Sequence, residues 1–211
     1  VPLLPKRRLS NQGMMHFQLL DDHQSFFEVA AAIAHENRQT AGPSSLESLK
    51  IEVDRHIPVS IVPLQTPIFN GSITANITLF APNPCWQHLQ RVVELAGLGS
   101  GIRRHPLGLG SRISSQHHRF DPTLQQQLGL ARALFAQPRA VIIELNAMTF
   151  VSPGFRDSLH RLLEQKLSIV LLSRESLEPL PGLYTVSKQD RDWQQVSPEH
   201  HLAKPRSKPH Q

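Results

Sequence analysis

The sequence predicts an α/β domain built on a mainly parallel sheet. Three short runs rich in Val, Ile and Leu have the length and composition of buried strands, at residues 57–64, 140–145 and 168–173. Stretches of helical character separate them, and helices that alternate with apolar strands are typical of parallel sheets covered by helices. A chain of 211 residues with 39% hydrophobic content is long enough for one domain with a substantial core.

The first elements form a strand–turn–helix unit. Residues 13–20 are a short apolar run that predicts a strand over 15–20, and the Ala-rich residues 26–34 have the character of a buried helix. The β-branched run that follows predicts an inner strand over 59–64. Two prolines, Pro58 and Pro63, confine its pairing to the middle of the run.

The central third is predicted to be mostly helical. Residues 86–97 place apolar side chains at helical spacing before a glycine stop. Residues 107–118 are rich in Gly, Ser and His and predict a loop. Residues 124–137 then predict a strong helix that Pro138 ends.

The last third returns to the sheet. Residues 140–145 are the most convincing buried parallel strand, residues 154–166 form an amphipathic helix, and residues 168–173 are another buried strand. Past Tyr184 the sequence turns polar. Residues 197–211 are rich in Pro and His without apolar periodicity, which predicts a disordered basic tail.

Composition limits the class of protein. The formal charge of +5 comes partly from Lys and Arg clusters at the two ends, which are better read as solvated tails than as nucleic-acid contacts. The single Cys85 excludes an internal disulfide framework and fits a reducing compartment. No run approaches the roughly 18 apolar residues of a membrane helix. A start at Val1 suggests an unusual start codon, a processed product or an excised piece of a longer chain.

The most specific stretch is LQTPIFNGSITANITLFAP, residues 64–82. It resembles the Q-loop of exporter-type ABC ATPases and the segment after it, through Gln65, Phe69, Gly71, Ser72, Ile73, Asn76 and Ile77. Residues 92–120 resemble the helical subdomain and the loop before the family signature. Residues 128–145 resemble the post-signature helix and the Walker B strand, and SIVLLSR resembles the H-loop strand. The resemblance covers about residues 10–190.

The resemblance implies a P-loop-NTPase-like fold with a helical, signature-bearing subdomain. We expect residues 1–196 to form the nucleotide-binding domain, with an α/β core at 13–74 and 138–190 and the helical subdomain at 75–137. The family has about two further strands before the segment that begins at Val1, one of them carrying an aromatic residue that stacks on adenine. We therefore expect an N-terminally truncated domain.

The phosphate-binding loop of the family is not preserved. An intact loop uses glycine amides, a Lys and a hydroxyl to hold the phosphates and Mg²⁺. Here the corresponding stretch is residues 20–28, where Ser25, Phe26, Phe27 and Glu28 stand at the last positions of the loop. Asp21 and Asp22 add negative charge that opposes a triphosphate. No cofactor is therefore expected, and ATP with Mg²⁺ is the only candidate.

The other nucleotide-contacting positions are changed as well. Glu144 stands at the Mg²⁺-ordering carboxylate and can still hold a metal, whereas Leu145 replaces the Glu that polarises water. The H-loop His position is Arg174, and the D-loop, residues 148–151, lacks its Asp. The degenerate signature consists of Phe120, Asp121, Pro122, Thr123 and Leu124, in which Pro122 removes an amide donor. Among the contact residues, only Gln65 is retained, either as a nucleotide contact or as an ordinary loop residue.

These changes predict a non-hydrolysing structural or regulatory subunit, or a remnant, of an ABC exporter. The expected partner is a transmembrane domain or subunit, with a second nucleotide-binding domain as a dimer partner, at the cytoplasmic side of the inner (plasma) membrane. One alternative is an ATP-binding subunit with residual nucleotide binding. Another is a small basic adaptor that binds an anionic surface.

Two remaining features favour ordinary roles. The adjacent His117 and His118 do not by themselves build a tetrahedral metal site. Trp86 and Phe69 are expected to be core residues rather than platforms that stack on a base.

Overall fold

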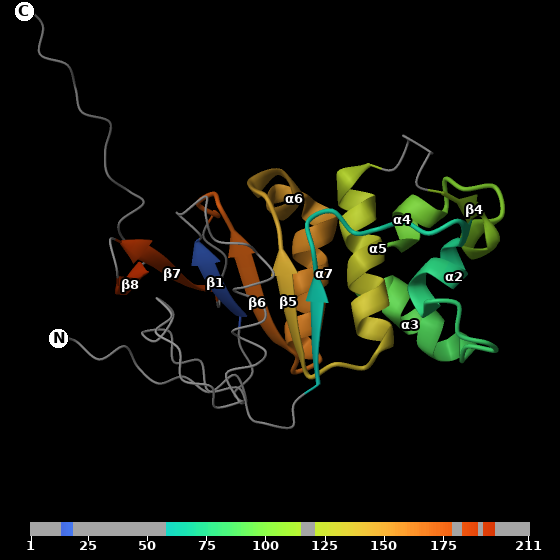
Figure 1. The fold of residues 1–211 in the computed structure, drawn as a ribbon, viewed down its shortest axis with the longest axis horizontal. Coiled ribbons are helices and arrows are strands. Elements are labelled where there is room, and N and C mark those ends of the chain that lie inside the picture. Colours follow the sequence, from blue (N-terminus) through green and yellow to red (C-terminus); the bar gives the residue numbers. More distant parts are fainter. Residues whose placement is uncertain (1–13, 19–57, 115–120, 179–182, 190–191, 197–211) are drawn as a thin grey trace, which may run out of the picture.

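The computed structural model describes residues 14–18, 58–114, 121–178, 183–189 and 192–196. Within these residues a six-stranded sheet has the order β2-β5-β6-β1-β7-β8 (Figure 1). Its strands are β1 Met14–Gln18, β2 Val59–Val62, β5 Ala140–Glu144, β6 Ser168–Ser173, β7 Leu183–Gln189 and β8 Asp192–Val196. Every neighbouring pair is parallel except β7 and β8. The predicted α/β class with a mainly parallel sheet is confirmed.

The predicted strands are all present, with small shifts at their ends. The strand at 168–173 is found as predicted, and the one at 140–145 ends one residue earlier. The predicted strand 59–64 stops at Val62 because Pro63 has no N–H to donate to the ladder. The pair β7 and β8 was missed, since this polar edge of the sheet lacks the apolar run of a buried strand.

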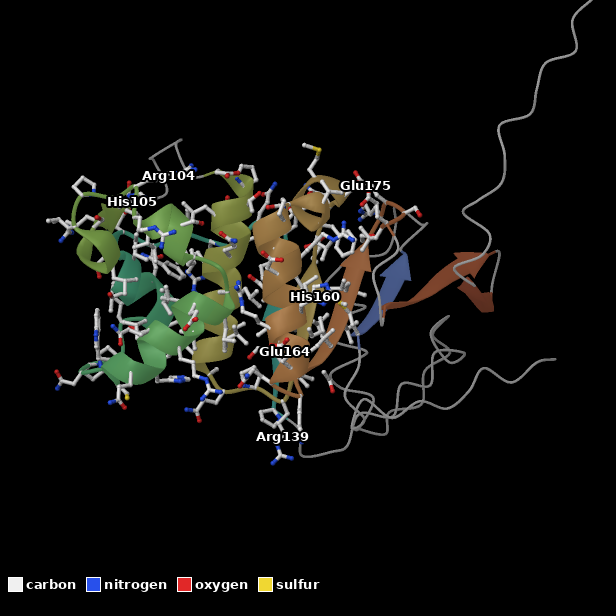
Figure 2. The ribbon with its side chains drawn as sticks, turned by 180° about the vertical axis from the view of Figure 1, so that it is seen from behind. Arg104, His105, Arg139, His160, Glu164 and Glu175 are labelled. Atoms are coloured by element: carbon white, nitrogen blue, oxygen red, sulfur yellow. The ribbon has the colours of Figure 1, made fainter. Side chains whose placement is uncertain are left out.

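Helices cover the face of the sheet seen in Figure 2. There α7, Pro153–Glu164, lies in front of the central strands with α5, Pro122–Phe135, beside it. Alternate residues of β5 and β6 share the core cluster with these two helices, namely Val141, Ile143, Ile169 and Leu171. The alternation follows from the two-residue period of a strand.

Apart from α6, Ala147–Val151, which follows β5, the remaining described elements form a small, mostly helical region beyond α5 (Figure 1). It contains β3 Gly71–Ser72, α2 Ile73–Thr78, α3 Trp86–Leu95, α4 Gly99–Ile102, the 3₁₀ turn η1 Gly108–Gly110 and β4 Arg112–Ile113. The prediction of a plain loop over 107–118 was wrong for its first half. Residues 108–110 form η1, and β4 pairs with β3, the two-residue strand directly before α2. Described helices include none long and apolar enough to cross a bilayer.

Helix ends follow local chemistry. The helix predicted at 124–137 begins two residues earlier because Asp121 caps it and Pro122 suits its first turn. The helix predicted at 86–97 ends at Leu95, and Gly97 follows with φ +71°. A Cβ at Gly97 would lie 2.6 Å from Oγ of Ser158, so this glycine also lets the chain approach α7.

Three predictions concern residues outside the described ranges. These are the helix at 26–34, the four phosphate-loop positions from Ser25 to Glu28, and the tail 197–211. The domain boundaries drawn from the sequence remain predictions.

Candidate functional site

One edge of the sheet collects three of the positions expected to contact nucleotide. Gln65 follows β2, Glu144 ends β5 and Arg174 follows β6, and the carboxyl ends of parallel strands lie at the same edge. Figure 2 shows this edge at Glu175 and the opposite edge at Arg139. In addition, β1 lies between β6 and β7, whereas the next strand in the sequence, β2, lies at the far edge of the sheet. Ligands of open α/β sheets bind at such a reversal of strand order.

Glu144 is partly buried and already engaged. Its Oε2 accepts a hydrogen bond from the backbone N–H of Leu64, with 3.0 Å between the atoms. Its backbone carbonyl accepts a hydrogen bond from the side-chain amide of Gln126, a buried residue of α5. Glu144 therefore joins three elements, which are β5, the segment after β2, and α5.

Leu145 is a core residue. Its side chain is 2% exposed and belongs to the main hydrophobic cluster, and its N–H donates to the carbonyl of Leu172 at 2.9 Å. The short helix α6, Ala147–Val151, follows directly and is held by Glu175, whose carboxylate accepts the N–H of Ala147 at 2.7 Å. An aliphatic side chain at position 145 supplies no general base to this edge.

The positions of the signature begin helix α5. The carboxylate of Asp121 accepts the N–H of Thr123 at 3.0 Å, and Pro122 has no N–H. Leu124 turns inward and packs against the core. Phe120 lies outside the described residues. In this first turn, the amide of Thr123 is already hydrogen-bonded and Pro122 has no amide N–H, so neither position can donate to an anion.

The Q-loop-like motif is held by its own hydrogen bonds. Asn76 is fully buried, and its side chain accepts the N–H of Phe69 and donates to the carbonyl of Phe69, both at 2.8 Å. Ser72 caps α2 by accepting the N–H of Ala75. Gln65 itself is exposed. The retention of Ser72 and Asn76 therefore has a structural reason that requires no nucleotide.

Comparison with known proteins identifies relatives among transporters. The chain is 23% identical over 134 residues to a putative export ATP-binding/permease protein of Rickettsia bellii, covering 62% of this chain and 23% of that one. It is 27% identical over 117 residues to ABC transporter B family member 7 of Dictyostelium discoideum, covering 56% and 14%. No family model matches.

The fold agrees with these relatives. A bacterial Atm1-family ABC exporter with ATP bound superposes with a TM-score of 0.65 at 12% identity, over 92% of this chain and 34% of that one. The chain is an exporter-type ABC domain. Its matched part spans less than a quarter of the two curated relatives' own length.

In this ABC domain, sequence reasoning missed Arg132. The side chain donates to the carbonyls of Asn76 at 2.8 Å and Pro67 at 2.9 Å, and its guanidinium lies 5.0 Å from the ring centre of Phe69. Partial burial lowers the pKa of Arg132 from its ordinary value. One signal could have revealed it, namely a single cation inside an otherwise apolar helical run, residues 128–135.

The surface near α2 of the ABC domain is apolar. Phe69 and Phe80 are 41% and 54% exposed and meet edge to face, with Leu79 beside Phe80 in the chain. These three residues are called the apolar patch below. The expectation that Phe69 and Trp86 are core residues was wrong, since Trp86 begins α3 and is also 54% exposed. Trp86 is the first residue of α3 and Phe69 lies in the segment before β3, and both rings remain partly in solvent.

In the described part of the domain, no group of three or more His, Cys, Asp or Glu side chains gathers at one place. His117 and His118 lie outside the described residues.

Proposed function

We propose that this chain is a non-hydrolysing nucleotide-binding domain of an ABC exporter, acting as a structural or regulatory part of a transport complex. Leu145 carries the proposal. It occupies the position where the family resemblance implies the carboxylate that orients the attacking water, and it is buried in the core instead. Replacement of a general base by an aliphatic side chain removes a contribution of about 10²–10⁴ in rate.

Two further features support the same proposal. Asp121 occupies the free amide of Thr123, and its negative charge opposes a phosphate at the start of α5. In the sequence, Phe26 stands where the family has the Lys that neutralises the phosphates. These changes affect both halves of the composite site that two such domains form in the family, so dimerisation with an intact domain would not rescue it.

The partner we propose is a transmembrane domain of the ABC exporter kind, on the same polypeptide or another. The apolar patch supports this choice. Both Leu79 and Phe80 have positive φ, 49° and 62°, a strained conformation that here exposes two large apolar side chains. Residues 58–90 contain no Asp, Glu, Lys or Arg, and the guanidinium of Arg132 lies on the ring of Phe69, so the surface suits a largely apolar contact. The domain would then lie at the cytoplasmic side of the inner (plasma) membrane.

Phosphate release by the purified chain at saturating Mg-ATP tests the catalytic half of the proposal. We expect no turnover above background, with Glu144→Ala as the control for contaminating ATPases. Turnover by the native chain that disappears in Glu144→Ala would refute the proposal.

A photo-reactive amino acid at position 80 tests the partner in cells of the source organism. We expect a crosslink to a transmembrane domain of the exporter kind, identified by mass spectrometry, and none from the exposed position 160 on α7. Crosslinks at position 80 that reach only water-soluble proteins would contradict the assignment.

A second candidate is an ATP-binding subunit with residual nucleotide binding. It is favoured by the names of relatives, among them the Lactococcin-A transport/processing ATP-binding protein of Lactococcus lactis. That protein is 31% identical over 87 residues, which make up 41% of this chain and 12% of that one. Equilibrium dialysis with labelled ATP separates the two candidates, because saturable Mg²⁺-dependent binding favours the second.

A further inference from the structure

We propose that Glu144 is a clamp on the segment after β2 rather than a metal ligand, and that this clamp helps to join the sheet and the helical region into one rigid body. The segment is residues 64–69, called the connector below. The proposal does not depend on whether the chain hydrolyses ATP, because it rests on contacts within the protein alone.

The connector is held at its start by the sheet. The N–H of Leu64 donates to Oε2 of Glu144 at 3.0 Å, across from the end of β5. The carbonyl of Glu144 is held in turn by Gln126 of α5. A hydrogen bond to a charged acceptor stabilises more than one between neutral groups, so Glu144 is a strong anchor for this amide.

The middle of the connector is held by helix α5. Thr66 is 1% exposed, and its carbonyl accepts a hydrogen bond from the side chain of Gln125 at 2.5 Å. The Thr66 hydroxyl donates back to the carbonyl of Pro63 at 3.3 Å. Thr66 is therefore bound to α5, the helix whose Gln126 also binds Glu144.

The end of the connector is held by α5 and by the helical region. Arg132 of α5 donates to the carbonyl of Pro67, and Asn76 of α2 forms two hydrogen bonds with the backbone of Phe69. The three anchor points lie on β5, α5 and α2. Rotation of the helical region against the sheet would have to break contacts at more than one of them.

Amide hydrogen exchange on the full chain tests this directly. The amides to follow are those of Leu64 and Phe69, resolved one by one by NMR, because these two donate hydrogen bonds to Glu144 and Asn76. In the native chain we expect slow exchange at both amides that 10 mM Mg²⁺ leaves unchanged. In Glu144→Ala we expect exchange about tenfold faster, because the charged acceptor of the Leu64 amide is lost.

Glu144→Gln separates a clamp from a metal ligand. The amide oxygen of Gln still accepts the N–H of Leu64 but is a poorer ligand for Mg²⁺, so we expect exchange within a factor of about three of the native rate. Glu164→Ala, at an exposed acidic residue at the end of α7, is the matched control and should leave the connector unchanged.

Three outcomes would overturn the clamp. These are near-unprotected exchange in the native chain, an unchanged connector in Glu144→Ala, or Mg²⁺-dependent protection that Glu144→Gln and Glu144→Ala both abolish. If Glu144→Ala does not fold, the Glu144→Gln variant and the Mg²⁺ series decide the test. Protection that persists in Glu144→Gln without Mg²⁺ supports the clamp, and loss of that protection refutes it.

Discussion

Thr66 occupies the space that a side chain at Gly129 would need. A Cβ placed on Gly129 would lie 2.1 Å from Oγ1 of Thr66 and 3.1 Å from its Cγ2. The connector and helix α5 are therefore in direct backbone-to-side-chain contact, and Gly129 is the residue that permits it.

Gly129→Ala should destabilise the domain. The added methyl would force the buried Thr66 or the helix to move, at a cost of about 2 kcal/mol even after the better helix propensity of Ala. Urea unfolding of the two proteins measures this difference. Gly154→Ala in α7 is the control, because a Cβ there meets nothing closer than 3.7 Å.

A second variant shows whether Thr66 is the cause. Thr66→Ala in the Gly129→Ala background removes Oγ1 and Cγ2 of Thr66, including the atom that lies 2.1 Å from the added Cβ. The double variant should therefore be more stable than the sum of the single effects implies. Additive effects would show that the clash lies elsewhere.

Asn76→Ala should also cost stability, by about 2–3 kcal/mol. It leaves the N–H and carbonyl of Phe69 without their partner in a partly buried site. Asn70→Ala is the matched control, since Asn70 is exposed and lies on the same segment. Equal losses for the two variants would contradict the role given to Asn76.

Arg132→Lys should cost about 1–2 kcal/mol although the charge is kept. A lysine cannot reach Pro67 and Asn76 together while lying flat on the ring of Phe69. The guanidinium stays charged throughout the neutral range, so the loss should be the same at about pH 6 and pH 8. Thermal unfolding at both values checks this, and a loss that varies with pH would point to another group.

ATP should leave the melting temperature nearly unchanged. With or without Mg²⁺, we expect a shift of less than about one degree at millimolar ATP, because ligand below its dissociation constant does not stabilise. Differential scanning fluorimetry is sufficient, with GTP as the comparison. A clear shift specific to ATP would instead favour the ATP-binding alternative.

The sheet could be predicted largely because its central strands are continuous apolar runs. Residues 140–144 and 168–173 are buried on both faces, and only parallel strands between layers have that composition. The hairpin of β7 and β8 could not be found in this way. Its strands at the edge of the sheet are polar, and their pairing depends on neighbours far away in the sequence.

The site was harder to predict than the fold. The sequence pattern located Glu144 and Leu145 at the end of a strand, but not the hydrogen bond from Leu64, which joins residues 80 positions apart. Gln125, Gln126 and Arg132 were missed because polar residues on a helix are normally solvent-facing. Here the helix lies between the connector and the sheet, so these side chains meet backbone groups instead.

The buried position of Leu145 leaves no place for a charged side chain at this point of the core. A glutamate placed there in the same conformation would bring an unpaired carboxylate into the core, which costs several kcal/mol, a large part of the stability of an ordinary domain. A single Leu145→Glu change would therefore cost folding stability before it could supply any chemistry. The packing around the end of β5 thus constrains this position, and a carboxylate there requires neighbouring residues to change with it.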